Sequence, residues 1–397
     1  MPKITKAELA SLGERTRLVV AGRDPADSFG FVNPPIVRGS TVLYPTTDDF
    51  LNRRARFAYG TKGNPTTEAL EEALGMIEGG AGIVLCPSGL LACTLPLLAA
   101  LGAGDHVLVP DSVYRPTRQF CDGLLKRLGV ETTYYDPLVA SAIEALFTDR
   151  TRVVVLESPG SQTLEVQDVP AIVAVARSRG AVTIMDNTWA TPLFFDAHKH
   201  GVDYSVQAGT KYPAGHSDVL IGSVSARTPE LYERLYGTWE QLGIVVSPED
   251  CFLTLRGLRT MSLRLARQGP AGLEMARWFG GRPEVARVLH PGLPDDPGHA
   301  LWRRDFTGCS SLFSVVLKPC SMRAVAAMLD GLRLFGLGAS WGGYESLALP
   351  FNCAPYRTAT RRGLEGPCVR FHIGLEDLDD LKADLDLGFA RLRSAAG

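Results

Sequence analysis

Features that are missing from the sequence exclude several classes of protein. Residues 1–17 contain no apolar core of a leader peptide, and no run reaches the roughly 20 apolar residues that a membrane-spanning helix needs. The 41 basic and 43 acidic residues are interspersed, so the net charge is only -2 and there is no basic stripe. We therefore expect a cytoplasmic protein that binds neither membranes nor nucleic acid.

Cysteine and histidine are also arranged without a pattern that would indicate a crosslink or a metal. The eight cysteines include no Cys-x-x-Cys pair, and several lie within apolar segments. His198 and His200 are two residues apart, which does not place them on one helix face, and no acidic or cysteine ligands accompany them. The sequence predicts neither a disulfide framework nor a metal site.

From Pro65 onward the sequence alternates between helix-sized and strand-sized apolar segments. Seven short strand candidates, nearly all apolar, lie between residues 82 and 226. Strands of this composition are typical of a buried, mostly parallel sheet with helices on both faces. We therefore predict an α/β fold of the large domain with a mostly parallel, seven-stranded sheet.

The pattern changes on both sides of this region. After about Thr228 longer helices are followed by mixed strands and helices, whereas the first 60 residues show little periodicity. A chain of 397 residues is too long for one small core. We predict an N-terminal arm at 1–60 that contacts a neighbouring subunit, a large domain at 61–254 and a smaller C-terminal α+β domain at 255–397.

The most specific chemical signal is an aspartate and a lysine at the ends of neighbouring predicted strands. Asp186 ends the segment AVTIMD, and Lys211 follows the segment DYSVQA within GTKYPAGHSD. Pyridoxal phosphate needs such a pair, because a lysine amine condenses with its aldehyde as a Schiff base and a carboxylate keeps its ring nitrogen protonated. Either residue alone could be a loop charge or a cap, so the prediction depends on the pair.

Other candidates around this pair are weaker. The turn CPSGLLA lies between a predicted strand and a helix, so the N–H groups of Ser88, Gly89 and Leu90 can face a phosphate. Dinucleotide and nucleoside triphosphate sites are disfavoured, because neither of their glycine-rich signatures occurs in the required context. Tyr114 could stack on a flat ring or fill the core, and Thr210 could bind phosphate or only end its strand.

An arginine could bind the substrate. Arg370 lies in the predicted strand VRFHIGL of the smaller domain. Since arginine binds a carboxylate through two parallel hydrogen bonds, Arg370 could hold an amino acid. A surface ion pair is the alternative.

These segments together resemble the Cys/Met metabolism family of pyridoxal phosphate enzymes, which have the aspartate aminotransferase type of fold. The resemblance covers nearly the whole chain, from YGTKGNPTT through LESPGSQTLEVQDVPAI, DNTWATPLF and QAGTKYPAGHSD to SWGGYESL and RFHIGLED. It implies that Lys211 carries the coenzyme, that Asp186 partners its ring nitrogen and that Tyr114 stacks on the ring.

The same resemblance implies further contacts. Phosphate would be held by Gly89, Leu90 and Thr210, and the substrate α-carboxylate by Arg370 with Ser340 and Trp341. Tyr59 would reach into the site of a neighbouring subunit, so a monomer would lack a complete site. We therefore expect a homotetramer built from two dimers, with sites at the subunit interfaces.

Two positions depart from the family pattern. Thr61 stands where an arginine commonly clamps the phosphate of the adjacent subunit, and Lys62 or Arg56 are candidates to replace it. Ala208 stands three residues before Lys211, where the family often has a serine hydroxyl.

The resemblance implies a reaction of methionine biosynthesis, the β-elimination of L-cystathionine and other cysteine S-conjugates to a thiol, pyruvate and ammonia. Lys211 would act as the general base, with Lys211 or Tyr114 supplying a proton to the leaving sulfur. Chemistry at the γ-carbon is the alternative, although Trp189 and the pair Trp341 and Tyr344 favour the β-carbon. A non-catalytic regulatory protein is less favoured, because the lysine and the aspartate are both present.

Overall fold

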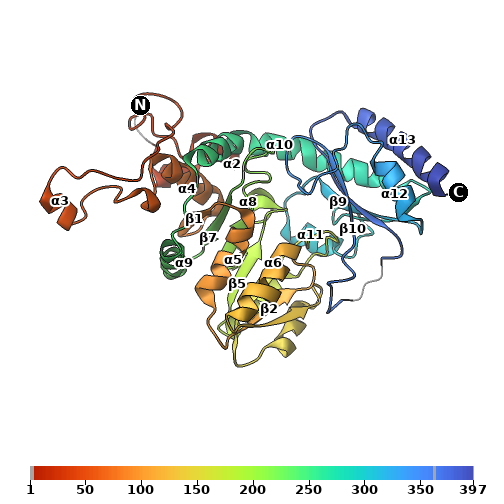
Figure 1. Cartoon of the computed structure of the whole chain (residues 1–397), viewed down its shortest axis with the longest axis horizontal. Coiled ribbons are helices and arrows are strands. Elements are labelled where there is room, and N and C mark those ends of the chain that lie inside the picture. Colours follow the sequence, from red (N-terminus) through yellow and green to blue (C-terminus); the bar gives the residue numbers. More distant parts are fainter. Residues whose placement is uncertain (1–3, 361–363, 397) are drawn as a thin grey trace.

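The computed structural model of the chain describes residues 4–360 and 364–396. A seven-stranded sheet forms the large domain, and a four-stranded sheet lies toward the C-terminal end (Figure 1). The N-terminal segment extends away from both (Figure 1).

The seven predicted strands are all present, in the spatial order β1-β7-β6-β5-β4-β2-β3. β7 runs antiparallel to both of its neighbours, and the other pairings are parallel. The predicted fold class is therefore confirmed. The strands are β1 Gly82–Cys86, β2 His106–Pro110, β3 Glu131–Tyr135, β4 Thr151–Glu157, β5 Val182–Asp186, β6 Tyr204–Gln207 and β7 Gly222–Ala226.

Both faces of this sheet are covered. Successive side chains of a strand point to opposite faces. Val153 accordingly belongs to the core cluster around helix α5 (Gly89–Ala100), and Val154 to the cluster around helix α7 (Val169–Ser178). Burial on two sides explains why these strands are continuous apolar runs without a polar alternation.

A long helix connects the two domains. Helix α10 (Pro248–Gly280) begins with Ser247 as its cap and proline at its first position. It contacts α4 in the large domain and β8 and β9 in the smaller one. The predicted domain boundary at 254/255 lies within this helix and stays a prediction. The other helices of the large domain are α4 Pro65–Glu78, α6 Arg115–Phe120, α8 Thr191–Phe194 and α9 Pro229–Gln241, with short turns η1 Gly60–Lys62, η2 Cys121–Leu125 and η3 Ala140–Leu146.

The smaller sheet is antiparallel, with the order β10-β11-β9-β8. Its strands are β8 Val285–Leu289, β9 Leu312–Leu317, β10 Leu347–Phe351 and β11 Cys368–His372, and its helices are α11 His299–Asp305, α12 Met322–Leu329 and α13 Leu378–Ala396. The sequence pattern indicated β9, β11, α12 and α13 but missed β8, β10 and α11. Both missed strands lie at the edges of the sheet. Pro350 in β10 and the exposed Arg287 in β8 interrupt the apolar pattern that would indicate a strand.

The N-terminal arm is only partly packed. Its helices are α1 Lys6–Ser11, α2 Glu14–Val20 and α3 Thr47–Leu51. Leu18 of α2 is buried in a core cluster, whereas Phe29 and Leu43 are 88% and 87% exposed. Figure 1 shows α3 at the far end of this extension. Across residues 4–360 and 364–396, no helix has the length and apolar character needed to cross a membrane.

Candidate active site

A cavity of about 240 Å³ lies at the carboxyl ends of the parallel strands, where open α/β sheets bind their ligands. Most of the residues predicted from the sequence line it: Ser88, Gly89, Leu90, Tyr114, Asp186, Thr210, Lys211, Trp341 and Arg370. Ser340 joins them, since its hydroxyl accepts a hydrogen bond from Lys211. Of the predicted residues, Tyr59 does not line this cavity.

Lys211 follows β6 and presents its amine to the cavity. Nζ donates to Ser340 Oγ at 2.8 Å and lies 5.4 Å from the centre of the Trp341 ring. Burial and the nearby Arg370 lower the pKa of Lys211 to about 8, and Asp186 opposes this shift. An amine with such a pKa is partly neutral near physiological pH and can act as a nucleophile or base.

Asp186 ends β5 and is buried in the same wall. The backbone N–H and the hydroxyl of Thr188 donate to Oδ1 at 3.0 and 2.5 Å, and Cys93 Sγ donates to Oδ2 at 3.4 Å. Burial raises the pKa of Asp186, while the Thr188 bonds and Lys211 oppose the shift. A buried carboxylate is costly unless a cation neutralises it. A protonated ring nitrogen would supply that cation.

The start of α5 offers a place for a phosphate. Ser88 caps this helix, its Oγ accepting from the N–H of Leu91 at 3.1 Å. The helix itself provides no partner for the N–H groups of Gly89 and Leu90, and its positive end attracts anions. A Cβ on Gly89 would lie 2.5 Å from the Cβ of Ala208, so only glycine fits between this turn and the Lys211 loop.

Thr210 and Tyr114 complete this side of the cavity. Thr210 Oγ1 donates to Ile221 O and accepts from Ile221 N, both at 3.1 Å, so binding a phosphate would require it to exchange one bond. Tyr114 caps α6, and its backbone N–H donates to Glu157 Oε2 at 2.7 Å. Burial raises the pKa of the Tyr114 phenol, which therefore keeps its proton at neutral pH.

Glu157 is a cavity residue that the sequence reasoning missed. It ends β4 directly beside Asp186 in the strand register, and Ser161 Oγ donates to its Oε1 at 2.6 Å. Burial and the neighbouring Asp186 raise the pKa of Glu157 to about 8. A signal was available, since Glu157 is a carboxylate at the end of an apolar strand, as Asp186 is.

Arg370 reaches the cavity from the smaller domain. It lies on β11, between β9 and β10, and its NH2 donates to Ser340 O at 3.3 Å. Burial lowers the pKa of Arg370 to about 10, which leaves the guanidinium charged at neutral pH. No carboxylate in the described parts of the chain forms an ion pair with it, so its fork is available for an amino-acid carboxylate.

The residues expected to act across a subunit interface lie elsewhere. Tyr59 is 47% exposed and lines a separate surface hollow together with Thr61. Lys62 pairs with Glu240, and Arg56 pairs with Asp27 and Glu68. Neither candidate replacement for the missing arginine therefore points into the cavity of its own chain.

These residues fit pyridoxal phosphate. The helix start would hold the phosphate, the buried carboxylate would pair with the ring nitrogen and the amine would react with the aldehyde, and all three groups line one cavity. In the described parts of the chain, no three or more histidine, cysteine, aspartate or glutamate residues gather as a metal site. The fold and the cavity define a pyridoxal phosphate-dependent enzyme with its site at the strand ends of a mostly parallel sheet.

Comparison with known proteins gives the family. The chain belongs to the family of Cys/Met metabolism PLP-dependent enzymes, which it matches over residues 15–390. A relative from Rhizobium johnstonii is 54% identical over 386 residues, 96% of this chain and 97% of its own length. The cystathionine beta-lyase of Escherichia coli is 43% identical over 388 residues, 95% of this chain and 98% of its own.

The solved structures agree with this assignment. The crystal structure of cystathionine gamma synthase from Xanthomonas oryzae pv. oryzae, in complex with aminoacrylate and cysteine, is similar with a TM-score of 0.89 and 35% identity. The similarity covers 97% of this chain and 99% of that one. The family and the coenzyme predicted from the sequence are therefore confirmed, while the roles of individual residues stay predictions.

Proposed function

We propose that the protein catalyses the β-elimination of L-cystathionine and other cysteine S-conjugates, releasing a thiol, pyruvate and ammonia, as a step of methionine biosynthesis. The observation that carries the proposal is the convergence of Lys211, Asp186 and Arg370 in one cavity. The similarity to a cystathionine beta-lyase over almost the whole chain supports it.

Each residue has a defined task in this reaction. When bound, pyridoxal phosphate supplies an electron sink for a carbanion at the substrate Cα. Arg370 and Ser340 hold the α-carboxylate and so orient the Cα–H bond. Asp186 holds the proton on the ring nitrogen, and Lys211, with its lowered pKa, takes the Cα proton. Tyr114 keeps its own proton and can give it to the leaving sulfur, as can protonated Lys211.

Chemistry at the γ-carbon, as in cystathionine γ-synthase, cystathionine γ-lyase or methionine γ-lyase, is the second candidate. The similarity to the cystathionine gamma synthase structure favours it. The two candidates give different products from cystathionine, since β-elimination yields pyruvate and homocysteine whereas γ-elimination yields 2-oxobutyrate and cysteine.

Product analysis tests the proposal. The purified protein should show the visible absorption band of lysine-bound coenzyme and release pyruvate and homocysteine from cystathionine in equal amounts. Lys211→Ala should show neither the band nor the products. Release of 2-oxobutyrate in place of pyruvate would move the reaction to the γ-carbon, and the coenzyme band without either keto acid would contradict the β-elimination of cystathionine.

The proposed assembly is a cytoplasmic homotetramer of two dimers. Tyr59 lies outside the cavity of its own chain, and the arm exposes apolar side chains such as Phe29 and Leu43. Exposed apolar surface of this kind is typical of a region that another chain covers. Sedimentation should therefore show a tetramer, and a catalytically competent monomer would contradict the assembly.

A further inference from the structure

A loop of the large domain brings a glutamine into the active-site cavity. Gln162 lies in the loop 158–167, between β4 and α7, and lines the cavity. The backbone angle φ is 66° at Gln162 and 58° at Leu164, and residues other than glycine rarely adopt such positive values. Such a conformation persists when surrounding contacts hold it in place.

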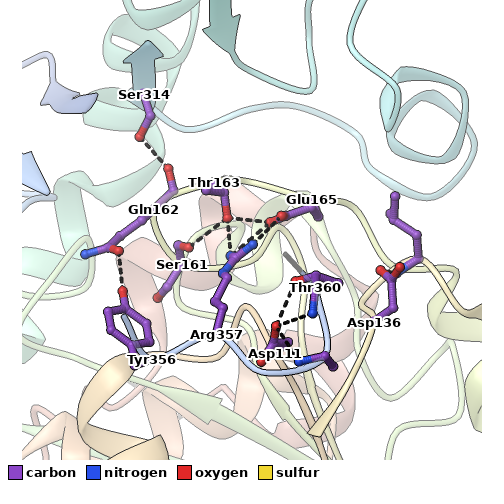
Figure 2. Close-up of polar contacts among 12 residues, drawn as sticks. Asp111, Asp136, Ser161, Gln162, Thr163, Glu165, Ser314, Tyr356, Arg357 and Thr360 are labelled. Atoms are coloured by element: carbon purple, nitrogen blue, oxygen red, sulfur yellow. Dashed lines mark hydrogen bonds and ion pairs between the residues drawn. The ribbon is translucent and has the colours of Figure 1, made fainter. Parts of the chain in front are cut away.

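Those contacts come from a segment far away in the chain, residues 352–360, which we call the strap. Arg357 of the strap pairs with Glu165 of the loop at 2.7 Å, and both side chains are almost fully buried. Asp111 accepts hydrogen bonds from the backbone N–H groups of Thr358 and Thr360 at 2.9 and 2.7 Å. Figure 2 shows this network between the loop and the strap. The loop is therefore fixed from outside the large domain.

The same contacts orient Gln162 itself. Ser314 Oγ donates to the backbone oxygen of Gln162 at 2.5 Å, and Tyr356 OH donates to its Oε1 at 2.6 Å. Ser314 is the partner of Arg370 in the register of β9 and β11, so the backbone of Gln162 lies beside the predicted α-carboxylate site. In Figure 2 its side chain extends from there toward Tyr356.

The amide nitrogen of Gln162 remains as a donor. The bond from Tyr356 to Oε1 fixes the orientation of the amide and leaves its two N–H groups as donors for a ligand. The guanidinium of Arg115 lies 5.2 Å from the centre of the Tyr356 ring, and within the described residues it forms no ion pair. Gln162 lines the cavity and Arg115 does not, so Arg115 places its charge beside the Tyr356 ring and outside the cavity wall.

We propose that Gln162, oriented by Tyr356, forms a subsite for the distal carboxylate of the substrate, the one on the half that leaves with the sulfur. This subsite rests on the proposed β-elimination, and it defines the preferred substrate class as thioethers that carry a second amino-acid group. An amide N–H group can donate to a carboxylate and cannot donate to an ammonium group. Substrates such as S-ethyl-L-cysteine lack the group that this subsite recognises.

The test compares two substrates in the coenzyme-loaded enzyme. Gln162→Leu should lower the ratio of kcat/KM for L-cystathionine to that for S-ethyl-L-cysteine by about tenfold or more, the scale of one hydrogen bond to a charged group. The change should lie mainly in KM for cystathionine. Gln162→Glu should lower the ratio further, because its carboxylate repels the distal one. Tyr356→Phe should lower it less, since the amide stays but loses its orientation.

Tyr134→Phe is the matched control for Tyr356→Phe. Its hydroxyl donates to Asp122 Oδ1 at 2.7 Å, and Tyr134 does not line the cavity. This variant should leave the substrate ratio within twofold of wild type. Equal losses on both substrates in Gln162→Leu would overturn the subsite and leave a structural role for the loop. A better KM for cystathionine in Gln162→Glu would also overturn it, by showing that an ammonium group is bound there.

A second readout separates the subsite from the reaction. The coenzyme absorption change on adding each amino acid gives a half-saturation concentration whether or not pyruvate forms. If wild type binds cystathionine more tightly than S-ethylcysteine and Gln162→Leu removes the difference, the subsite stands even where the proposed reaction fails. If the difference survives in Gln162→Leu, the subsite is overturned even where pyruvate forms.

Discussion

Two pairs of buried carboxylates near the strand ends of the large domain differ in what neutralises them. Asp111 and Glu165 face arginines of the same chain, Arg118 at 2.9 Å and Arg357 at 2.7 Å. Glu157 and Asp186 lie side by side on β4 and β5, and neither forms an ion pair in the described parts of the chain.

The pKa values follow this difference. Burial by itself would raise the pKa of every one of these carboxyl groups. Hydrogen bonds and the arginines reverse the effect at Asp111 and Glu165, whose pKa values lie below the usual range. At Glu157 and Asp186 burial prevails, and both pKa values are raised. A carboxylate matched within the chain stabilises the fold, whereas an unmatched one is available for a cation from outside.

The largest expected effect is on the matched pair. Arg357→Met leaves Glu165 buried without its cation and should lower the free energy of unfolding by about 3–5 kcal/mol. Urea denaturation of the variant and wild type measures the difference. Adding Glu165→Leu to Arg357→Met should recover much of the loss, because no unpaired charge then remains.

The control for this variant is an exposed ion pair. Arg150 pairs with Glu131 at 2.6 Å on the surface, and the two side chains are 56% and 57% exposed. Arg150→Met should cost less than about 1 kcal/mol, since water and salt screen such pairs. Equal losses in both variants would show that burial does not distinguish them.

The unmatched pair should behave in the opposite way. Asp186→Asn removes the charge that would hold a proton on the ring nitrogen, so pyruvate formation should fall by about 10²- to 10³-fold, the scale of one preorganised charge in an active site. Its unfolding free energy without coenzyme should stay equal or rise, because the cost of burying a charge is gone. An Asn variant with full activity, or one that loses several kcal/mol of stability, would contradict this assignment.

Glu157 should make the stability of the protein depend on pH. Because the pKa of Glu157 is raised to about 8, the folded protein binds a proton that the unfolded chain has lost between the ordinary pKa and pH 8. The contribution of Glu157 to stability is therefore largest below its ordinary pKa and falls as pH rises toward 8, by at most about 1.4 kcal/mol per pH unit.

Glu157→Gln isolates this contribution. Glutamine cannot ionise, so the stability of the variant without coenzyme should vary less between pH 5 and 8 than that of wild type. Denaturation curves at several pH values measure both slopes. Identical slopes would mean that Glu157 stays ionised throughout this range and that Asp186 does not raise its pKa.

The strands and the coenzyme pair could be predicted because each rests on a local pattern. The apolar runs follow from burial on both sheet faces, and Lys211 and Asp186 were found because each directly follows or ends such a run. The edge strands β8 and β10 were not predicted, because their exposure to solvent interrupts the apolar run by which the other strands were found. Gln162 was also not predicted as a site residue, because nothing in its local sequence indicates a loop that lines a cavity.

The sequence by itself therefore determined the fold class, the coenzyme and the family, since short spacings at strand ends encode them. Only the tertiary structure decided that Glu157 lies against Asp186 and that Tyr356 meets Gln162 across 194 residues of chain. The order of strands in the sheet and the docking of the strap create these contacts. No local pattern encodes them, because the free energy that holds distant segments together comes from packing and charge pairing after the chain has folded.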